Sequence, residues 1–63
     1  MNHKQLIGAL EQLLDRAEQA ARRCESLREV SSESEKERWA EEAQCRWAEV
    51  ELLREALKLA QSL

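Results

Sequence analysis

The sequence has no proline, phenylalanine or tyrosine, and Gly8 is its only glycine. No apolar run exceeds three residues, whereas a membrane-spanning helix needs about 20. The N-terminus lacks the apolar core of a secretory signal, so we expect a cytoplasmic protein without a membrane partner. The net charge of −3 argues against sequence-independent binding of nucleic acid, and we predict no nucleic-acid partner.

Groups that could carry out chemistry are also scarce. His3 is the only histidine, and Cys24 and Cys45 are the only thiols. A zinc site needs four ligands at short, paired spacings, which these residues do not offer. The sequence also lacks a Ser/His/Asp set and a glycine-rich phosphate loop. We therefore predict no catalytic, cofactor-binding or metal site and a protein that is not an enzyme, and we expect both thiols to be reduced and buried.

What is present is helix-forming sequence with a clear apolar period. Ala, Leu, Glu, Gln, Arg and Lys predominate, and all of them favour helices. A heptad seam spaced 4-3-4-3-4-3 runs through the first half, and Ile7, Leu14 and Ala21 widen it on one side. This pattern predicts one amphipathic helix over about residues 4–30. The members of the seam are Leu6, Leu10, Leu13, Ala17, Ala20, Cys24 and Leu27.

The polar segment that follows, Val30-Ser31-Ser32-Glu33-Ser34, interrupts this seam. Ser32 with Glu35, and Ser34 with Glu37, both have the spacing of a helix-initiating capping box. We predict a turn at about residues 31–34 and a second helix over about residues 33–62. A single helix of about 60 residues is the alternative, because no proline or glycine lies between residues 9 and 63. That helix would place four polar residues in succession on the seam, so we favour the hairpin.

The second helix carries two apolar stripes, separated by about 130° at 100° per residue. A helix that is apolar over so much of its circumference is buried against more than one neighbour. We expect one stripe to face the first helix and the other to face another chain. The first stripe holds Trp39, Ala40, Ala43, Trp47, Val50, Leu53, Leu57 and Ala60, and the second holds Cys45, Ala48, Leu52, Ala56, Leu59 and Leu63.

A chain of 63 residues is too short to build a large core by itself, because it buries only about 60% of its unfolded surface. We therefore predict a single all-α domain, residues 1–63, folded as an antiparallel helical hairpin that assembles into a dimeric four-helix bundle. The second stripe is the predicted association face for a homodimer or another protein. We add Trp47 to it, since tryptophan is enriched at binding hot spots.

One polar strip on the first helix also has the character of a contact surface. Its residues fall within about 60° of one another without an acid among them, and they include Gln12, Arg16, Gln19 and Arg23. With its heptad seam and outward polar residues on helix 1, the chain resembles the Rop family of plasmid-encoded RNA-binding regulators. That resemblance implies a dimeric four-helix bundle and RNA binding.

A second resemblance rests on the apolar second helix, from Trp47 through Leu63. In this respect the chain looks like the small cytosolic co-chaperones of type III secretion needle subunits, which implies binding to a protein. We predict a non-catalytic protein-interaction module, such as an adaptor, inhibitor or co-chaperone, that acts through an apolar face of the second helix. The alternatives are a Rop-like dimeric RNA-binding regulator and a purely self-assembling structural protein.

Overall fold

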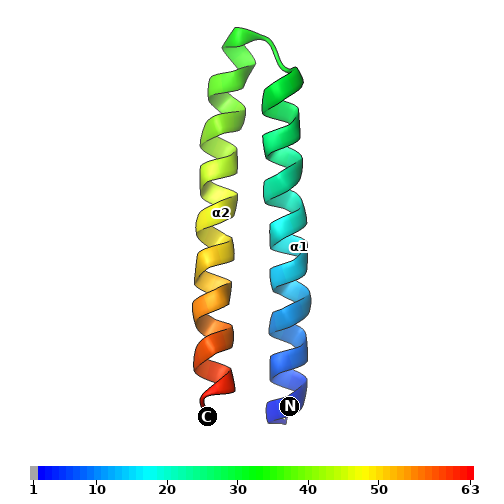
Figure 1. Ribbon diagram of the computed structural model, residues 1–63, viewed down its shortest axis with the longest axis vertical. Helices are drawn as coiled ribbons and strands as arrows, with labels where there is room; N and C mark the ends of the chain where they lie inside the picture. Colours follow the sequence, from blue (N-terminus) through cyan, green and yellow to red (C-terminus); the bar gives the residue numbers. More distant parts are fainter. Residues whose placement is uncertain (1) are drawn as a thin grey trace.

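The computed structural model describes residues 2–63, which form two α-helices and no strand. Helix α1 spans His3–Val30 and helix α2 spans Glu33–Gln61. The helices lie side by side and antiparallel, with the turn at one end and both termini at the other (Figure 1). The molecule is a rod of 47 × 14 × 13 Å. The predicted hairpin is confirmed, with helix bounds within one residue of the prediction at each end, and the single long helix is wrong.

The turn consists of two serines with extended backbone. Ser31 has φ −90° and ψ 160°, and Ser32 has φ −67° and ψ 165°. Ser32 begins α2 as its N-cap through its backbone carbonyl, which accepts from the amides of Glu35 at 3.0 Å and Lys36 at 2.8 Å. Its hydroxyl caps no amide and lies 3.3 Å from the Ser34 hydroxyl. The capping box predicted at Ser32 or Ser34 is therefore wrong, because the Ser32 side chain is turned toward Ser34.

A capping box is instead present at the start of α1. The Asn2 Oδ1 accepts from the Gln5 amide at 2.8 Å, and the Gln5 Oε1 accepts from the Asn2 amide at 3.2 Å. Two backbone amides that have no partner inside the helix are satisfied in this way. The three-residue spacing of Asn2 and Gln5 can be seen in the sequence. The capping box that these two residues form sets the beginning of α1.

The core between the helices is thin. The buried residues are Ala21, Cys24, Ala43, Val50 and Ala60, and Val50 is the largest side chain that is completely buried. Small residues let the two helices approach closely, but they remove little apolar surface from water. Larger apolar residues are exposed in greater number: Leu6, Leu13, Val30, Leu52, Leu59 and Leu63. Within residues 2–63, as many Leu, Ile and Val side chains are exposed as are half-buried, and Val50 alone among them is completely buried. The half-buried residues are Ile7, Leu10, Leu14, Leu27, Leu53 and Leu57.

The first stripe of α2 faces α1. Ala43, Val50 and Ala60 are buried, and its other members are half-buried. Within residues 2–63, neither helix offers a stretch of the length and apolarity that crossing a bilayer requires.

Candidate association surface

The second stripe of α2 lies almost entirely outside the core. Leu52 is 71% exposed, Leu59 68% and Leu63 93%. Cys45 and Ala48 are also exposed, and Ala56 is half-buried. The six residues predicted for association therefore form an apolar line along α2 that α1 does not cover.

Trp47 lies away from this line. Its indole N–H donates to the Glu25 carboxylate on α1 at 3.3 Å, and its ring is half-buried. Seven residues further along α2, and so on the same face, Arg54 pairs with Glu18 of α1 at 3.5 Å. We call this side of the hairpin, with Glu18, Glu25, Trp47 and Arg54, the paired flank. The structure places Trp47 there and separates it from the other six predicted residues.

The opposite side of the hairpin has exposed leucines on α1. Leu6 is 39% and Leu13 49% exposed, and Ala20 continues their heptad spacing. Ala20 shares a hollow with Glu42 of α2. From Glu42 the alternating three- and four-residue spacing runs on through Cys45, Glu49, Leu52, Ala56 and Leu59. Glu42 and Ala56 are half-buried beside the contact, whereas Leu52 and Leu59 lie on the face of α2 turned away from α1. We call the exposed apolar surface of this side of α1 and of the outer face of α2 the open flank, defined by Leu6, Leu13, Leu52, Ala56 and Leu59.

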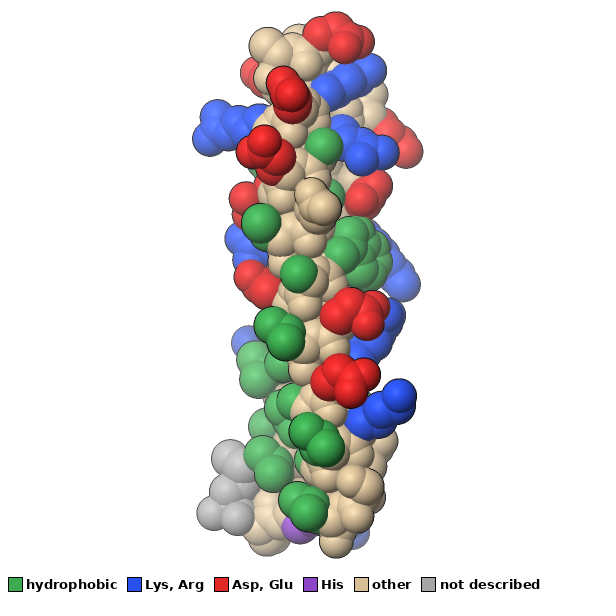
Figure 2. Space-filling view, turned by 90° about the vertical axis from the view of Figure 1, so that its left-hand side faces the viewer, with side chains coloured by type: hydrophobic (Ala, Val, Ile, Leu, Met, Phe, Trp, Pro, Cys, Tyr) green, Lys and Arg blue, Asp and Glu red, His purple; other side chains and the backbone are tan. Residues whose placement is uncertain are grey.

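The exposed leucines of both helices lie in the half of the rod that holds the termini. Because the chain turns at residues 31–32, each residue of α1 lies level with the residue equally far from the turn on α2. Leu13 is thus level with about residue 50, and Leu6 with about residue 57. Figure 2 shows hydrophobic side chains gathered over the half of the molecule that holds the termini, whereas charged side chains crowd the half near the turn.

Near the turn, the open flank is a hollow with a charged rim. Arg46 on this rim is held by Glu42 at 3.2 Å and Glu49 at 3.7 Å. Two further arginines, Arg23 and Arg38, also reach the hollow. The open flank therefore changes from apolar near the termini to charged near the turn. The residues that line the hollow are Ala20, Arg23, Cys24, Leu27, Arg38, Trp39, Glu42 and Arg46.

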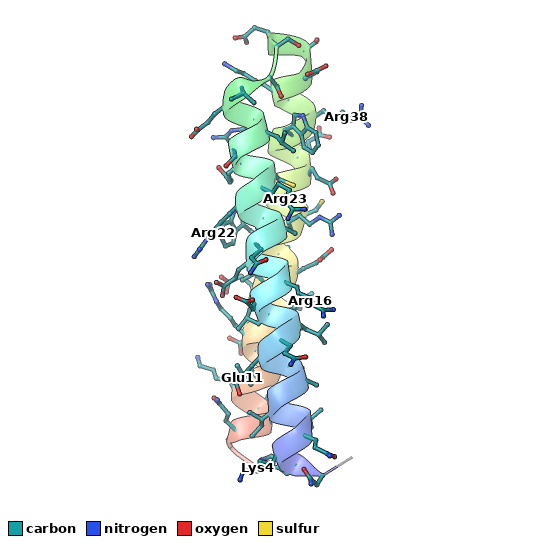
Figure 3. All side chains as sticks on the ribbon, turned by 90° about the vertical axis from the view of Figure 1, so that its right-hand side faces the viewer. Lys4, Glu11, Arg16, Arg22, Arg23 and Arg38 are labelled. Carbon is teal, nitrogen blue, oxygen red and sulfur yellow. The ribbon has the colours of Figure 1, made fainter. Side chains whose placement is uncertain are left out.

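The predicted polar strip of Gln12, Arg16, Gln19 and Arg23 is exposed along its whole length. The Gln19 amide donates to Asp15 at 3.1 Å. Neither Arg16 nor Arg23 takes part in an ion pair within residues 2–63. In Figure 3 Arg16 and Arg38 project toward one edge of the hairpin, Arg22 projects toward the opposite edge, and Arg23 lies over the front of α1 between them. The strip therefore borders the open flank on the α1 side.

The reactive groups are dispersed. Cys24 is buried and Cys45 is exposed, and the two thiols are not joined. The prediction that both are buried is wrong for Cys45, because its position on α2 faces outward along the open flank. In the part of the chain that the structure describes, no three His, Cys, Asp or Glu side chains converge to hold a metal ion.

Leu6 and Leu13 were absent from the predicted association face, although the sequence contains a signal for them. The apolar arc of helix 1 spans about 160°, and Leu6 and Leu13 lie at the opposite edge from Ile7 and Leu14. A single neighbouring helix does not cover so wide an arc, so one edge remains outside the contact.

No protein-family model matches the chain, and comparisons with curated proteins and with solved structures found no match. What the chain does must be inferred from its own surfaces.

Proposed function

We propose that the protein is a non-catalytic interaction module, which works by binding protein through the open flank and the exposed stripe of α2. The observation that carries this proposal is the imbalance between core and surface. The largest completely buried side chain is Val50, while Leu52, Leu59 and Leu63 are each at least two-thirds exposed. Contiguous exposed apolar surface of this kind marks an interaction site in a folded protein.

The free energy gained by covering this surface is substantial. Burying one leucine side chain contributes about 1.5–3 kcal/mol, so covering Leu52 and Leu59 on the outer face of α2 contributes several kcal/mol. The completed assembly is a helical bundle, because a helix or helical hairpin presents the matching apolar stripe. We place this module in the cytoplasm, since the unjoined thiols of Cys24 and Cys45 suit a reducing compartment.

A charged substitution in the stripe tests the proposal. Leu59→Asp places a carboxylate where an apolar contact is required, and we expect it to abolish association with any protein partner. Gln44→Asp is the matched control, because Gln44 is exposed on α2 and the change adds the same charge away from the stripe. The readouts are the solution mass and the proteins cross-linked to the chain in extracts of its source cells. An unchanged mass together with an unchanged set of cross-linked proteins for Leu59→Asp would contradict the proposal.

RNA binding is the second candidate function, and one observation favours it. Arg16 and Arg38 project toward one edge of the hairpin in Figure 3, and Arg23 lines the same hollow as Arg38. None of the three is in an ion pair within the described residues. Binding to phosphates would fall steeply with salt and weaken when Arg16 and Arg23 are replaced by alanine. Affinity for structured RNA that does not change between 50 and 200 mM salt would contradict this function.

A further inference from the structure

We infer that the partner of the outer face of α2 is a second copy of this chain, packed antiparallel so that the twofold axis passes at Leu52. The inference rests on the proposed function and adds to it the partner, its direction and its register. Each copy contributes α2 to the contact, and each α1 stays on the side of its own α2 that is turned away from the contact.

The contact is formed by an uncharged line of five residues on α2. Cys45, Ala48, Leu52 and Leu59 are exposed, and Ala56 is half-buried. Figure 2 looks onto α2 from the side away from α1 and shows hydrophobic side chains following this helix toward its C-terminal end. The packing of α1 leaves this line largely uncovered, so it is accessible to a second molecule.

The line has the symmetry that a self-pairing requires. Its spacing is three, four, four and three residues, which is the same in both directions from Leu52. In an antiparallel pair centred there, Leu52 meets Leu52 of the second copy. Cys45 of each copy meets Leu59 of the other. Ala48 likewise meets Ala56. Every layer is therefore apolar, and the large Leu59 side chain packs on the small Cys45 side chain, as close packing favours.

Charged residues near this line disfavour a parallel pair. Arg38 is exposed and lies two heptads before Leu52 on α2. A parallel pair brings Arg38 level with Arg38 of the second copy, and it does the same for Glu49 and Glu55. Like charges in direct opposition disfavour an interface. In the antiparallel pair, Arg38 lies beyond the end of the other α2. The two copies of Glu49 are then about 9 Å apart along the axis, and each keeps its own partner Arg46 at 3.7 Å.

The length of the contact sets the register. With Leu52 on the axis, residues 43–61 of the two α2 helices overlap, over about 28 Å at 1.5 Å per residue. A shift of one heptad toward the C-terminus still brings Leu52 onto Leu59, but the overlap shrinks to residues 50–61, about 18 Å, and Cys45 is left uncovered. A standard interface removes about 800 Å² of accessible surface from each partner. One helix face offers less than this in either register, so the longer overlap is favoured and the dimer should dissociate on dilution.

A disulfide trap tests the direction and the register. The variant carries Leu59→Cys together with the native Cys45, and Cys24→Ala removes the buried thiol. Within one chain, positions 45 and 59 are about 21 Å apart along α2, whereas a disulfide needs Cα atoms within about 7 Å. A bond between these positions therefore forms only between copies. After oxidation with copper phenanthroline at millimolar protein concentration, we expect a covalent dimer whose peptide map links position 45 to position 59.

The matched control carries Lys58→Cys in place of Leu59→Cys. Lys58 is also exposed, but it lies about 100° away from Leu59 around the helix, so we expect at least tenfold less covalent dimer through position 58. Links from 45 to 45 and from 59 to 59 would show a parallel pair and overturn the inference, while supporting the proposed function. A 45–59 link no more abundant than the 45–58 link would overturn the inferred pairing. The proposed function would be lost only if Leu59→Asp also left the cross-linked proteins unchanged.

A leucine exchange tests the layer that joins Cys45 to Leu59. Leu59→Ala removes two leucines from the dimer, and we expect the dimer dissociation constant measured by sedimentation equilibrium to rise about a hundredfold or more. Adding Cys45→Leu returns a large side chain to the same layer and should lower the constant again by at least tenfold. Adding Ala48→Leu instead is the control, because that leucine lies opposite Ala56 and leaves the layer unfilled. Equal effects of Cys45→Leu and Ala48→Leu would overturn the register, and circular dichroism checks that each variant keeps its helices.

Discussion

The paired flank and the open flank are built from the same two helices, but they differ in how their side chains are used. Only on the paired flank do polar side chains of the two helices contact each other across the hairpin. On the paired flank, Glu18 reaches Arg54 and Glu25 reaches Trp47 from one helix to the other. On the open flank, leucines such as Leu13 and Leu52 stand exposed. Polar side chains on the paired flank contact each other within the hairpin, whereas the uncovered leucines form the surface to which we propose that another molecule binds.

The largest effect is expected when the open flank is made polar. Replacing Leu52 and Leu59 by aspartate removes four leucines from a dimer interface, each contributing about 1.5–3 kcal/mol. For the wild-type chain, the urea midpoint measured by circular dichroism should rise with protein concentration, because folding is coupled to association. The double variant should unfold at much lower urea and show no concentration dependence. If both chains keep the same concentration-dependent midpoint, the open flank is not the interface.

A substitution in the core between the flanks should weaken the hairpin itself. Val50→Ala removes two methyl groups from a completely buried site, which costs about 2 kcal/mol per chain with the cavity included. The urea midpoint should fall, while the mass at high concentration stays that of the dimer. Loss of the dimer with an unchanged midpoint would mean that Val50 lies at the interface between copies.

A substitution on the paired flank should have the smallest effect on stability and association. Trp47→Phe removes the hydrogen bond to Glu25 but keeps an aromatic ring, so the free energy of unfolding should fall by about 1 kcal/mol. Light scattering should give the same mass as for the wild-type chain. A variant that becomes monomeric would show that Trp47 belongs to the association surface after all, as the sequence predicts.

Much of this architecture is readable from the sequence, because helix formation and apolar period are local properties. The two helices and the turn at Ser31 and Ser32 follow from the seam that stops at Val30. The two stripes of α2 follow from the spacing of its apolar residues, and the stripe with Ala43 and Val50 faces α1. These features depend on neighbours within one or two helical turns.

The rest depends on how the two helices pack along their length, which no local pattern specifies. The sequence assigns Leu6 and Leu13 to the same seam as Cys24, and Leu6 lies about five helical turns from Cys24 on the same face of α1. Cys24 is nevertheless buried while the two leucines are exposed. Trp47 likewise is assigned to both stripes by its type and spacing, and only its contact with Glu25 places it on the paired flank. The exposed Cys45 thiol is a further case, since only the packing of α2 on α1 leaves it on the uncovered face.

The most direct test of the account is the solution mass of the wild-type chain and of Leu59→Asp, measured by light scattering over a concentration series. The account predicts a mass of twice 7.3 kDa for the wild-type chain, which falls only on dilution. For Leu59→Asp it predicts 7.3 kDa at every concentration. Equal masses for the two chains across the series, whether monomer or oligomer, would contradict the claim that the open flank completes its core with a second copy.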